Sequence, residues 1–222
     1  MTINEKEKDL VLVQRARNGD REAFQEIVEK YQSRAYVIAF QIVGSSADAE
    51  DVVQESFVKA YLSLQKFQGN SAFYTWLYRI VYNMALDIKR KISRLDQKSQ
   101  EFNEEYVNIS PQGSSNIASL VDTPEQRYLE GEALGVLQKV LDGLSDEHRV
   151  VLVLRELDGL SYDEIAKVTN VSRGTVMSRL FYAREAFRGG VSERFTEQAK
   201  VKRGSGKEVN RKGKNSSVLN ET

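Results

Sequence analysis

The chain has 222 residues, of which 32 are Lys or Arg, 32 are Asp or Glu and 41% are hydrophobic, so it predicts one large or two small domains, each with a core. The zero net charge excludes a uniformly basic protein, and any nucleic-acid surface has to be a local patch. The chain has no cysteine and only one histidine, His148, which excludes disulfides, thiolate metal sites and multi-histidine centres, and we expect no cofactor. No apolar run is long enough for a signal peptide or a membrane span, so we expect a cytoplasmic protein.

The first part of the chain carries helical patterns. A short helix near 10–17 is followed by one that Asp20 can cap and that Gly44 can end. Ser45 or Ser46 can cap the next helix, and Ser71 can cap another that runs to about residue 91. Both prolines of the chain lie later, in its middle. We therefore predict a compact unit of four helices.

The second part begins after a change of composition. Residues 93–123 are rich in Ser, Asn and Gln and hold five acids against two bases, which predicts a flexible acidic linker. Thr123 and Pro124 suit a helix start, and we predict helices at about 124–142, 146–157, 162–169 and 173–188. The tail after Gly190 loses its apolar period and becomes basic, so we expect it to be disordered.

The pattern from Ser161 to Arg188 predicts a helix-turn-helix. Ser161 can cap a short helix, Asn170 and Val171 can make a tight turn, and Ser172 can cap a second helix. That second helix would present side chains able to bond to bases or phosphates, namely Arg173, Thr175, Ser178, Arg179 and Tyr182. The alternative is a pair of packed amphipathic helices with a solvated arginine face.

Five aromatic residues stand within ten positions, namely Phe73, Tyr74, Trp76, Tyr78 and Tyr82, and four bases follow between 89 and 94. Rings that lead into a basic helix end suit single-stranded nucleic acid, because bases stack on rings and phosphates follow cations. The competing interpretation, which is favoured by the apolar neighbours of these rings, places them in the core.

Asp48, Asp51 and Glu55 recur at spacings of three and four, so they share one face of the predicted third helix. Such carboxylates can be catalytic, can hold magnesium, can form a docking surface or can be merely solvated. No phosphate loop, histidine or further carboxylate motif accompanies them. We therefore predict that the protein is not an enzyme.

Three runs together resemble one family: DAEDVVQESFVKAY (48–61), KFQGNSAFYTWLYRIVYNMALD (66–87) and LSDEHRVVLVLRELDGLSYDEIAKVTNVSRGTVMSRLFYAREAF (144–187). They are similar to the extracytoplasmic-function group of alternative sigma factors of bacterial RNA polymerase. The resemblance implies an all-α fold with sigma domain 2 at 1–94, a flexible acidic linker at 95–123 and sigma domain 4, with the helix-turn-helix, at 124–190. A disordered basic tail at 191–222 lies outside it.

The resemblance also implies roles for single residues. The face that grips the clamp helices of the polymerase largest subunit would hold Asp48, Asp51, Gln54 and Glu55. The −10 element would be captured as a flipped base and a single strand by Gln68, Gly69, Asn70, Ser71, Tyr78, Asn83, Lys89 and Arg90. The −35 element would be read as a duplex by Ser172, Arg173, Thr175, Met177, Ser178, Arg179, Phe181 and Tyr182. Family members frequently have Arg or Lys at the position of Met177, and Arg or His at that of Tyr182.

The implied function is that of an alternative sigma factor, which binds core polymerase, directs it to promoters and assists their melting in a transcriptional stress response. The implied partners are the clamp helices, the flap of the second-largest subunit, promoter DNA and an anti-sigma factor, often one in the membrane. No small-molecule substrate is implied. The alternative is a stand-alone helix-turn-helix repressor or activator, which normally dimerises so that two recognition helices reach two half-sites.

Overall fold

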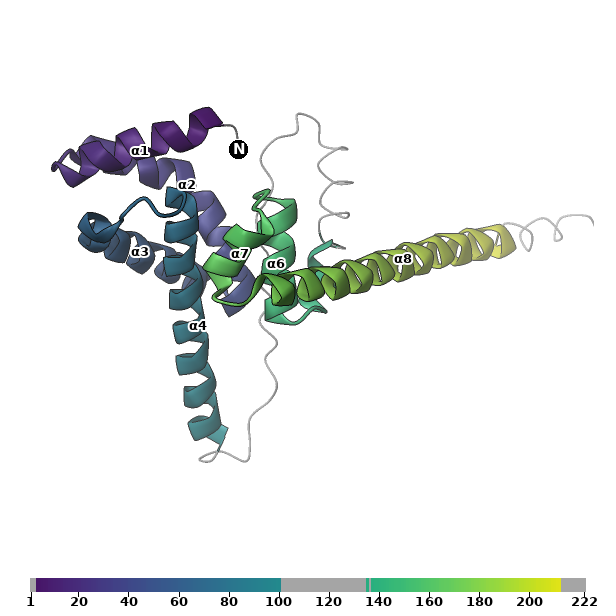
Figure 1. The fold of residues 1–222 in the computed structure, drawn as a ribbon. Coiled ribbons are helices and arrows are strands. Elements are labelled where there is room, and N and C mark those ends of the chain that lie inside the picture. Colours follow the sequence, from purple (N-terminus) through teal and green to yellow (C-terminus); the bar gives the residue numbers. More distant parts are fainter. Residues whose placement is uncertain (1–2, 101–134, 136, 213–222) are drawn as a thin grey trace, which may run out of the picture. The chain divides into compact units, whose positions relative to one another are not determined.

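The computed structural model describes the backbone of residues 3–100, 135 and 137–212 (Figure 1). Every regular element in these ranges is a helix, which confirms the predicted all-α fold. In chain order the elements are α1 (Ile3–Arg17), α2 (Arg21–Val43), α3 (Ser46–Ser63), η1 (Leu64–Lys66), α4 (Phe73–Gln100), α6 (Asp146–Glu156), α7 (Tyr162–Thr169) and α8 (Arg173–Lys212). None of these helices combines the length and the hydropathy that crossing a membrane requires.

Packing divides the chain into two units. The first contains α1 to α4, α6, α7 and the beginning of α8 up to Phe181. Of the described residues, the second contains 135, 137–144 and the rest of α8 from Tyr182 onward. Most of the predicted linker and much of the helix predicted at 124–142 lie outside the described residues. The predicted domain boundaries remain a prediction.

The ends of α2 and α3 follow from local side-chain chemistry. The Asp20 carboxylate accepts a hydrogen bond from the backbone N–H of Ala23 at 3.1 Å, and Gly44 ends α2 with φ of 75°, a value that glycine adopts without strain. The Ser45 hydroxyl accepts from the N–H of Asp48 at 3.4 Å and so begins α3. These caps are the predicted ones. By contrast α4 begins at Phe73, with the Ala72 carbonyl accepting from the Trp76 N–H, so the cap predicted at Ser71 is wrong.

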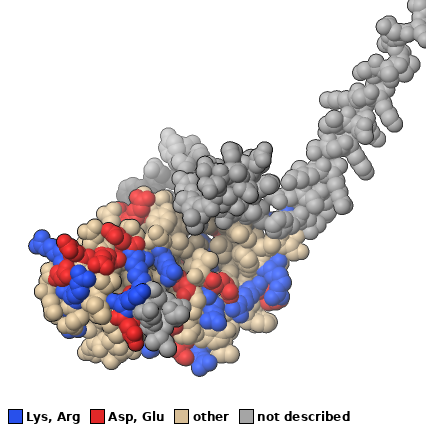
Figure 2. Space-filling view, turned by 90° about the horizontal axis from the view of Figure 1, so that it is seen from above, with Lys and Arg blue, Asp and Glu red and all other residues tan. Residues whose placement is uncertain are grey.

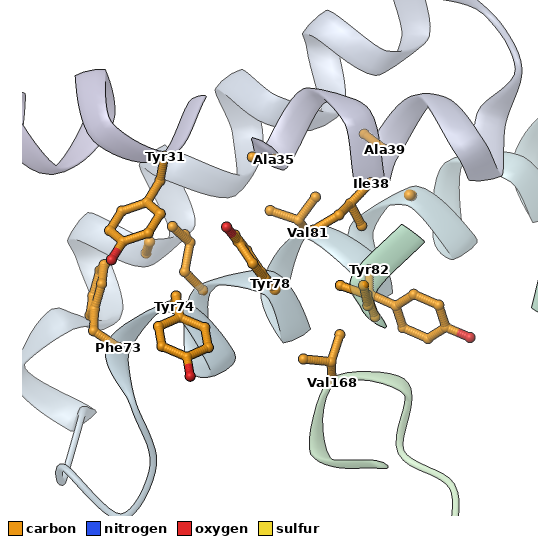
Figure 3. Close-up of a cluster of buried hydrophobic side chains, with 14 of the residues drawn as sticks. Tyr31, Ala35, Ile38, Ala39, Phe73, Tyr74, Tyr78, Val81, Tyr82 and Val168 are labelled. Carbon is orange, nitrogen blue, oxygen red and sulfur yellow. The ribbon is translucent and has the colours of Figure 1, made fainter. Parts of the chain in front are cut away.

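The core of the first unit forms where α2, α3 and α4 pack together. Tyr31 and Ile38 of α2 and Val81 of α4 are at most 1% exposed, and Figure 3 shows them with the buried rings of α4. Val168 of α7 belongs to the same apolar cluster. Burying side chains of this size contributes about 1.5–3 kcal/mol each, so this cluster holds the elements that carry the candidate sites in place.

Two helices extend beyond their predicted ends. The helix α4 continues to Gln100 rather than ending near residue 91, and α8 continues to Lys212 rather than ending near 188. Residues 191–212, which we predicted to be disordered, are therefore helical. The added stretches contain no proline and are rich in Lys, Arg, Gln and Glu, whose helix propensity outweighs the glycines of the tail.

Candidate nucleic-acid interface

The loop between η1 and α4 borders a cleft of about 390 Å³. Gln68, Asn70 and Ser71 line it, and Gly69 turns the chain between them with φ of 74°. The Asn70 amide donates to the Gln68 side-chain oxygen at 3.1 Å, so the two polar side chains hold each other at the rim. The structure thus places the loop at a cleft, and contact of its residues with a base stays a prediction.

The rest of the lining combines a ring, cations and a buried hydroxyl. Trp76 is half-buried and packs on Phe67, with ring centroids 5.4 Å apart, while Lys66 and Arg79 are exposed. The Thr75 hydroxyl is buried and has no hydrogen-bond partner among the described residues. An indole that can stack with a base, cations that can meet phosphates and a polar atom without a partner suit one extruded nucleotide.

Lys167 also lines the cleft, although it comes from α7. No pattern in the sequence indicates this, because Lys167 is one exposed lysine on a helix far along the chain. Lys66 and Arg79, by contrast, stand within a few residues of the predicted loop. Their position next to the aromatic cluster was the only local signal for them.

The aromatic cluster of α4 lies mainly in the core, which agrees with the competing interpretation. Phe73, Tyr74, Tyr78 and Tyr82 are at most 6% exposed, and Figure 3 shows their rings among the apolar side chains of neighbouring helices. The predicted DNA contact at Tyr78 is therefore not on the surface: its ring packs against that of Tyr31 at 6.2 Å, and burial raises its pKa. Of the five aromatic residues only Trp76 reaches the cleft.

The polar residues further along α4 lie at or near the surface. Asn83 is exposed, as its predicted role requires. Lys89 forms an ion pair with Asp146, and Arg90 pairs with Asp87 at 3.0 Å. On the face that Figure 2 shows, basic and acidic side chains are interspersed in the same way. Lys89 and Arg90 are thus paired with carboxylates that a phosphate backbone would have to displace.

The helix-turn-helix is present as predicted in α7, α8 and the turn between them. A capping box starts α7: the Glu164 N–H donates to the Ser161 hydroxyl at 3.3 Å, and the Ser161 N–H donates to the Glu164 carboxylate at 2.9 Å. Asn170 ends α7 in the left-handed region with φ of 55°, and Ser172 caps α8 by accepting from the Thr175 N–H at 3.0 Å. Short-range chemistry therefore fixes where the second helix starts.

The predicted reading residues of α8 differ in exposure. Arg173, Ser172, Met177, Ser178, Phe181 and Tyr182 are exposed. Thr175 and Arg179 are only partly exposed. Arg179 lies near Tyr82 of α4. Burial raises the pKa of the Tyr82 phenol, and the guanidinium of Arg179 partly opposes this rise. Its side chain therefore lies partly against α4 within the first unit rather than pointing wholly outward as predicted.

The acidic residues of α3 form a partly exposed face. Asp51, Gln54 and Glu55 are exposed, and Asp48 is half-buried beside the cap at Ser45. The same face continues into two exposed apolar side chains, Val58 at 60% and Leu62 at 76%. Within the described residues no group of three His, Cys, Asp or Glu side chains is placed to hold a metal ion. An acidic stripe that ends in apolar side chains suits a protein surface with basic residues beside an apolar patch.

Ion pairs and hydrogen bonds tie α6 and α7 to α2 and α4 within the first unit. The Tyr74 hydroxyl donates to the Glu164 carboxylate, and Arg34 of α2 pairs with Asp158, which follows α6, at 3.6 Å. Burial raises the pKa of Glu164, but hydrogen bonds from Tyr74 and Ser161 outweigh it and bring the pKa to about 2. Burial raises the pKa of Asp158 to about 6, against the opposing effects of Arg34 and Tyr78. One of these carboxylates is thus held charged, whereas the other is costly to charge.

Comparison with known proteins places these features in one family. Residues 27–95 match the family described as Sigma-70 region 2, and residues 134–187 match Sigma-70, region 4. The ECF RNA polymerase sigma-E factors of Salmonella typhimurium (strain LT2) and Escherichia coli (strain K12) are each 40% identical to this chain over 184 residues, which is 83% of this chain and 94% of theirs. That of Haemophilus influenzae is 39% identical over 177 residues, 80% of this chain and 92% of its own.

Solved structures agree with this. The sigma factor RpoE of Bartonella quintana, in complex with the anti-sigma factor NepR, superposes with a TM-score of 0.59 and 25% identity over 76% of this chain and 96% of RpoE. CnrH, in complex with the cytosolic domain of CnrY, shares the fold with a TM-score of 0.58 and 24% identity over 84% of this chain and 98% of its own. With two matching regions in order and 40% identity over most of its length, this chain belongs to the extracytoplasmic-function sigma factors of bacterial RNA polymerase.

Proposed function

We propose that this protein is an alternative sigma factor that binds core RNA polymerase, directs it to specific promoters and assists promoter melting. The observation that carries the proposal is the cleft beside Gln68–Ser71. It joins a stacking ring, cations and the unpartnered Thr75 hydroxyl in a chain whose second region ends in a helix-turn-helix. One part thus suits an extruded base, and the other suits duplex DNA.

Opening of the −10 element would exchange base stacking within the duplex for base stacking on the protein. Unstacking a base costs a few kcal/mol, and stacking on an aromatic side chain contributes about 1–3 kcal/mol per base. The firm packing of Trp76 against Phe67 and Phe73 keeps its ring in place before the base arrives, so little ordering is required on binding. Lys66 and Arg79 would hold the strand on either side of the captured base.

Docking on polymerase would use the face of α3 that carries Asp51, Gln54, Glu55, Val58 and Leu62. Both DNA contacts then act from one tethered assembly, so neither has to be strong alone. The polymerase performs the nucleotidyl transfer, and this chain supplies recognition without catalysis of its own. Because bacterial RNA polymerase acts in the cytoplasm, the proposed function implies a cytoplasmic protein.

An anti-sigma factor is a further proposed partner. RpoE was solved with the anti-sigma factor NepR bound, and CnrH was solved with the cytosolic domain of CnrY bound. Surfaces that dock on polymerase stay exposed when polymerase is absent, as Val58 and Leu62 do here. A partner that covers them would keep the factor inactive until it is needed in a stress response.

Reconstitution with purified core polymerase tests the function. The complete chain is added to core polymerase and fragmented genomic DNA from the source organism, and transcript start sites are mapped. We expect start sites that depend on the chain and share two spaced upstream elements. Start sites that are the same with and without the chain, together with tight binding of dimers to palindromic DNA, would instead identify a stand-alone regulator.

A further inference from the structure

The polar side chains at the start of α8 already have bonding partners within the helix-turn-helix. The Ser172 and Thr175 hydroxyls bond to each other at 2.8 Å, and the Ser178 hydroxyl donates to the Thr175 carbonyl at 3.0 Å. Arg173 pairs with Asp163 at 3.6 Å. Each of these groups would have to give up or share a bond in order to read a base edge.

The same turns of α8 expose two large apolar side chains. Met177 is 52% and Phe181 is 62% exposed, and they stand four residues apart, so they lie on one face of the helix. Val176 and Leu180, which are at most 1% exposed, anchor the neighbouring face of the helix in the core. The anchored side therefore fixes Met177 and Phe181 as an outward apolar pair on the recognition helix.

Only one base presents an apolar group at the edge of the major groove. Thymine carries a 5-methyl group there, whereas guanine, cytosine and adenine present hydrogen-bonding atoms. Guanine is read by donors such as those of arginine and lysine, and methionine has no proton to donate. A thioether and a phenyl ring thus match a methyl group better than they match any other feature of the groove.

We propose that Met177 and Phe181 read thymine methyl groups, so that the upstream element of the promoters of this protein holds thymine at the positions that the pair faces. The inference rests on the proposed function, since it assigns a sequence preference to the same recognition helix. The early position of the pair on the second helix of a helix-turn-helix favours DNA over a protein as its ligand, because that part of the helix meets base edges.

The first part of the test selects the sequence. Holoenzyme made with the complete chain is incubated with duplexes that are randomised over the upstream element, and the bound DNA is sequenced. We expect thymine to be enriched at one or two positions with the natural chain. Met177→Arg should change the preference at one of them to guanine, while Phe181→Ala should remove the preference at a position nearby.

The second part measures the methyl group itself. Uracil, which differs from thymine only by the lack of that methyl group, is placed at the enriched positions. The natural holoenzyme should lose about fourfold in affinity, the factor expected for burial of one methyl-sized group. Met177→Ala should bind DNA with thymine and DNA with uracil equally well at the position that residue 177 faces. Glu185→Ala, an exposed substitution further along α8, is the matched control and should respond to uracil as the natural chain does.

The outcomes separate this inference from the proposed function. Enriched promoters that show guanine at these positions, or no response to uracil, would overturn the thymine preference while leaving the sigma factor in place. Weaker binding of Met177→Ala or Phe181→Ala to core polymerase without DNA, with unchanged base preference, would show that the pair docks on a protein and would also overturn it. Selection of no promoter at all would contradict both proposals.

Discussion

Reversing two charges on α3 should weaken the binding of core polymerase. Asp51 and Glu55 lie one turn apart with exposed side chains. An exposed ion pair is worth about 0.2–1 kcal/mol, and replacing attraction by repulsion roughly doubles the change. The variant with Asp51→Lys and Glu55→Lys should therefore lose about 1–4 kcal/mol, or about 5- to 1000-fold in affinity. The loss should shrink as salt is added, because screening weakens exposed charges.

The assay is the anisotropy of labelled protein titrated with purified core polymerase at two salt concentrations. The matched control is Glu22→Lys with Glu29→Lys, which makes the same charge change on exposed positions of α2. The α3 variant should unfold within about 0.5 kcal/mol of the natural protein, because surface substitutions have small effects. The control should be less stable by about 1 kcal/mol, because Glu22 lies in the first turn of α2, where a carboxylate is favourable. Equal affinity for the α3 variant and the natural chain, or an equal loss in the control, would refute the docking surface.

Three further perturbations address opening, stability and the linker. Asn70→Ala should reduce the permanganate reactivity of the melted strand on duplex templates, and a template mismatched over the melted positions should restore it. The control Asn18→Ala, in another exposed turn, should have no effect, and a deficit that persists on the mismatched template would contradict a role in opening. Asp158→Asn should raise the free energy of unfolding by about 1–2 kcal/mol at pH 7.5 and by less at pH 5. The pKa of Asp158 in the folded protein, about 6, lies above its value in the unfolded chain, so the charged form that costs stability disappears as the pH falls. Denaturant unfolding at the two pH values measures this effect, and an unchanged or lowered stability at pH 7.5 would contradict it. Replacing the five acids of residues 93–123 by Ser or Gln should weaken the holoenzyme in a salt-dependent way and change the yield of abortive transcripts, whereas a merely solvated tether would leave both unchanged.

The features that local chemistry determines could be predicted from the sequence. The caps at Asp20, Ser161 and Ser172 each depend on a side chain and an N–H three residues away, so their positions were correct. The start of α4 was not, because the helix begins at Phe73, whose ring packs against Tyr31, Phe67 and Trp76 from other parts of the fold and from its own first turn. Local rules do not include such long-range contacts.

Parts of the candidate site that depend on packing were missed for the same reason. Lys167 reaches the cleft only because α7 packs in the first unit, and Arg179 turns toward Tyr82 for a similar cause. The burial of Tyr78 also depends on neighbours, since helical period puts Trp76 and Tyr78 on different sides of α4 without saying which side is covered. The loop at Gln68–Ser71 could be located because its turn residues and its place before an aromatic helix are both visible locally, while its contact with DNA stays a prediction.

The carboxylate of Glu164 closes the capping box of α7 and also accepts the Tyr74 hydroxyl and, at 3.4 Å, the Lys6 ammonium. One side chain therefore starts a helix and joins it to two others. A genetic screen for loss of promoter use should recover substitutions at this position even though it is not among the predicted DNA contacts. Such alleles should be temperature-sensitive rather than altered in promoter choice, and second-site suppressors should arise in the apolar core instead of in the promoter.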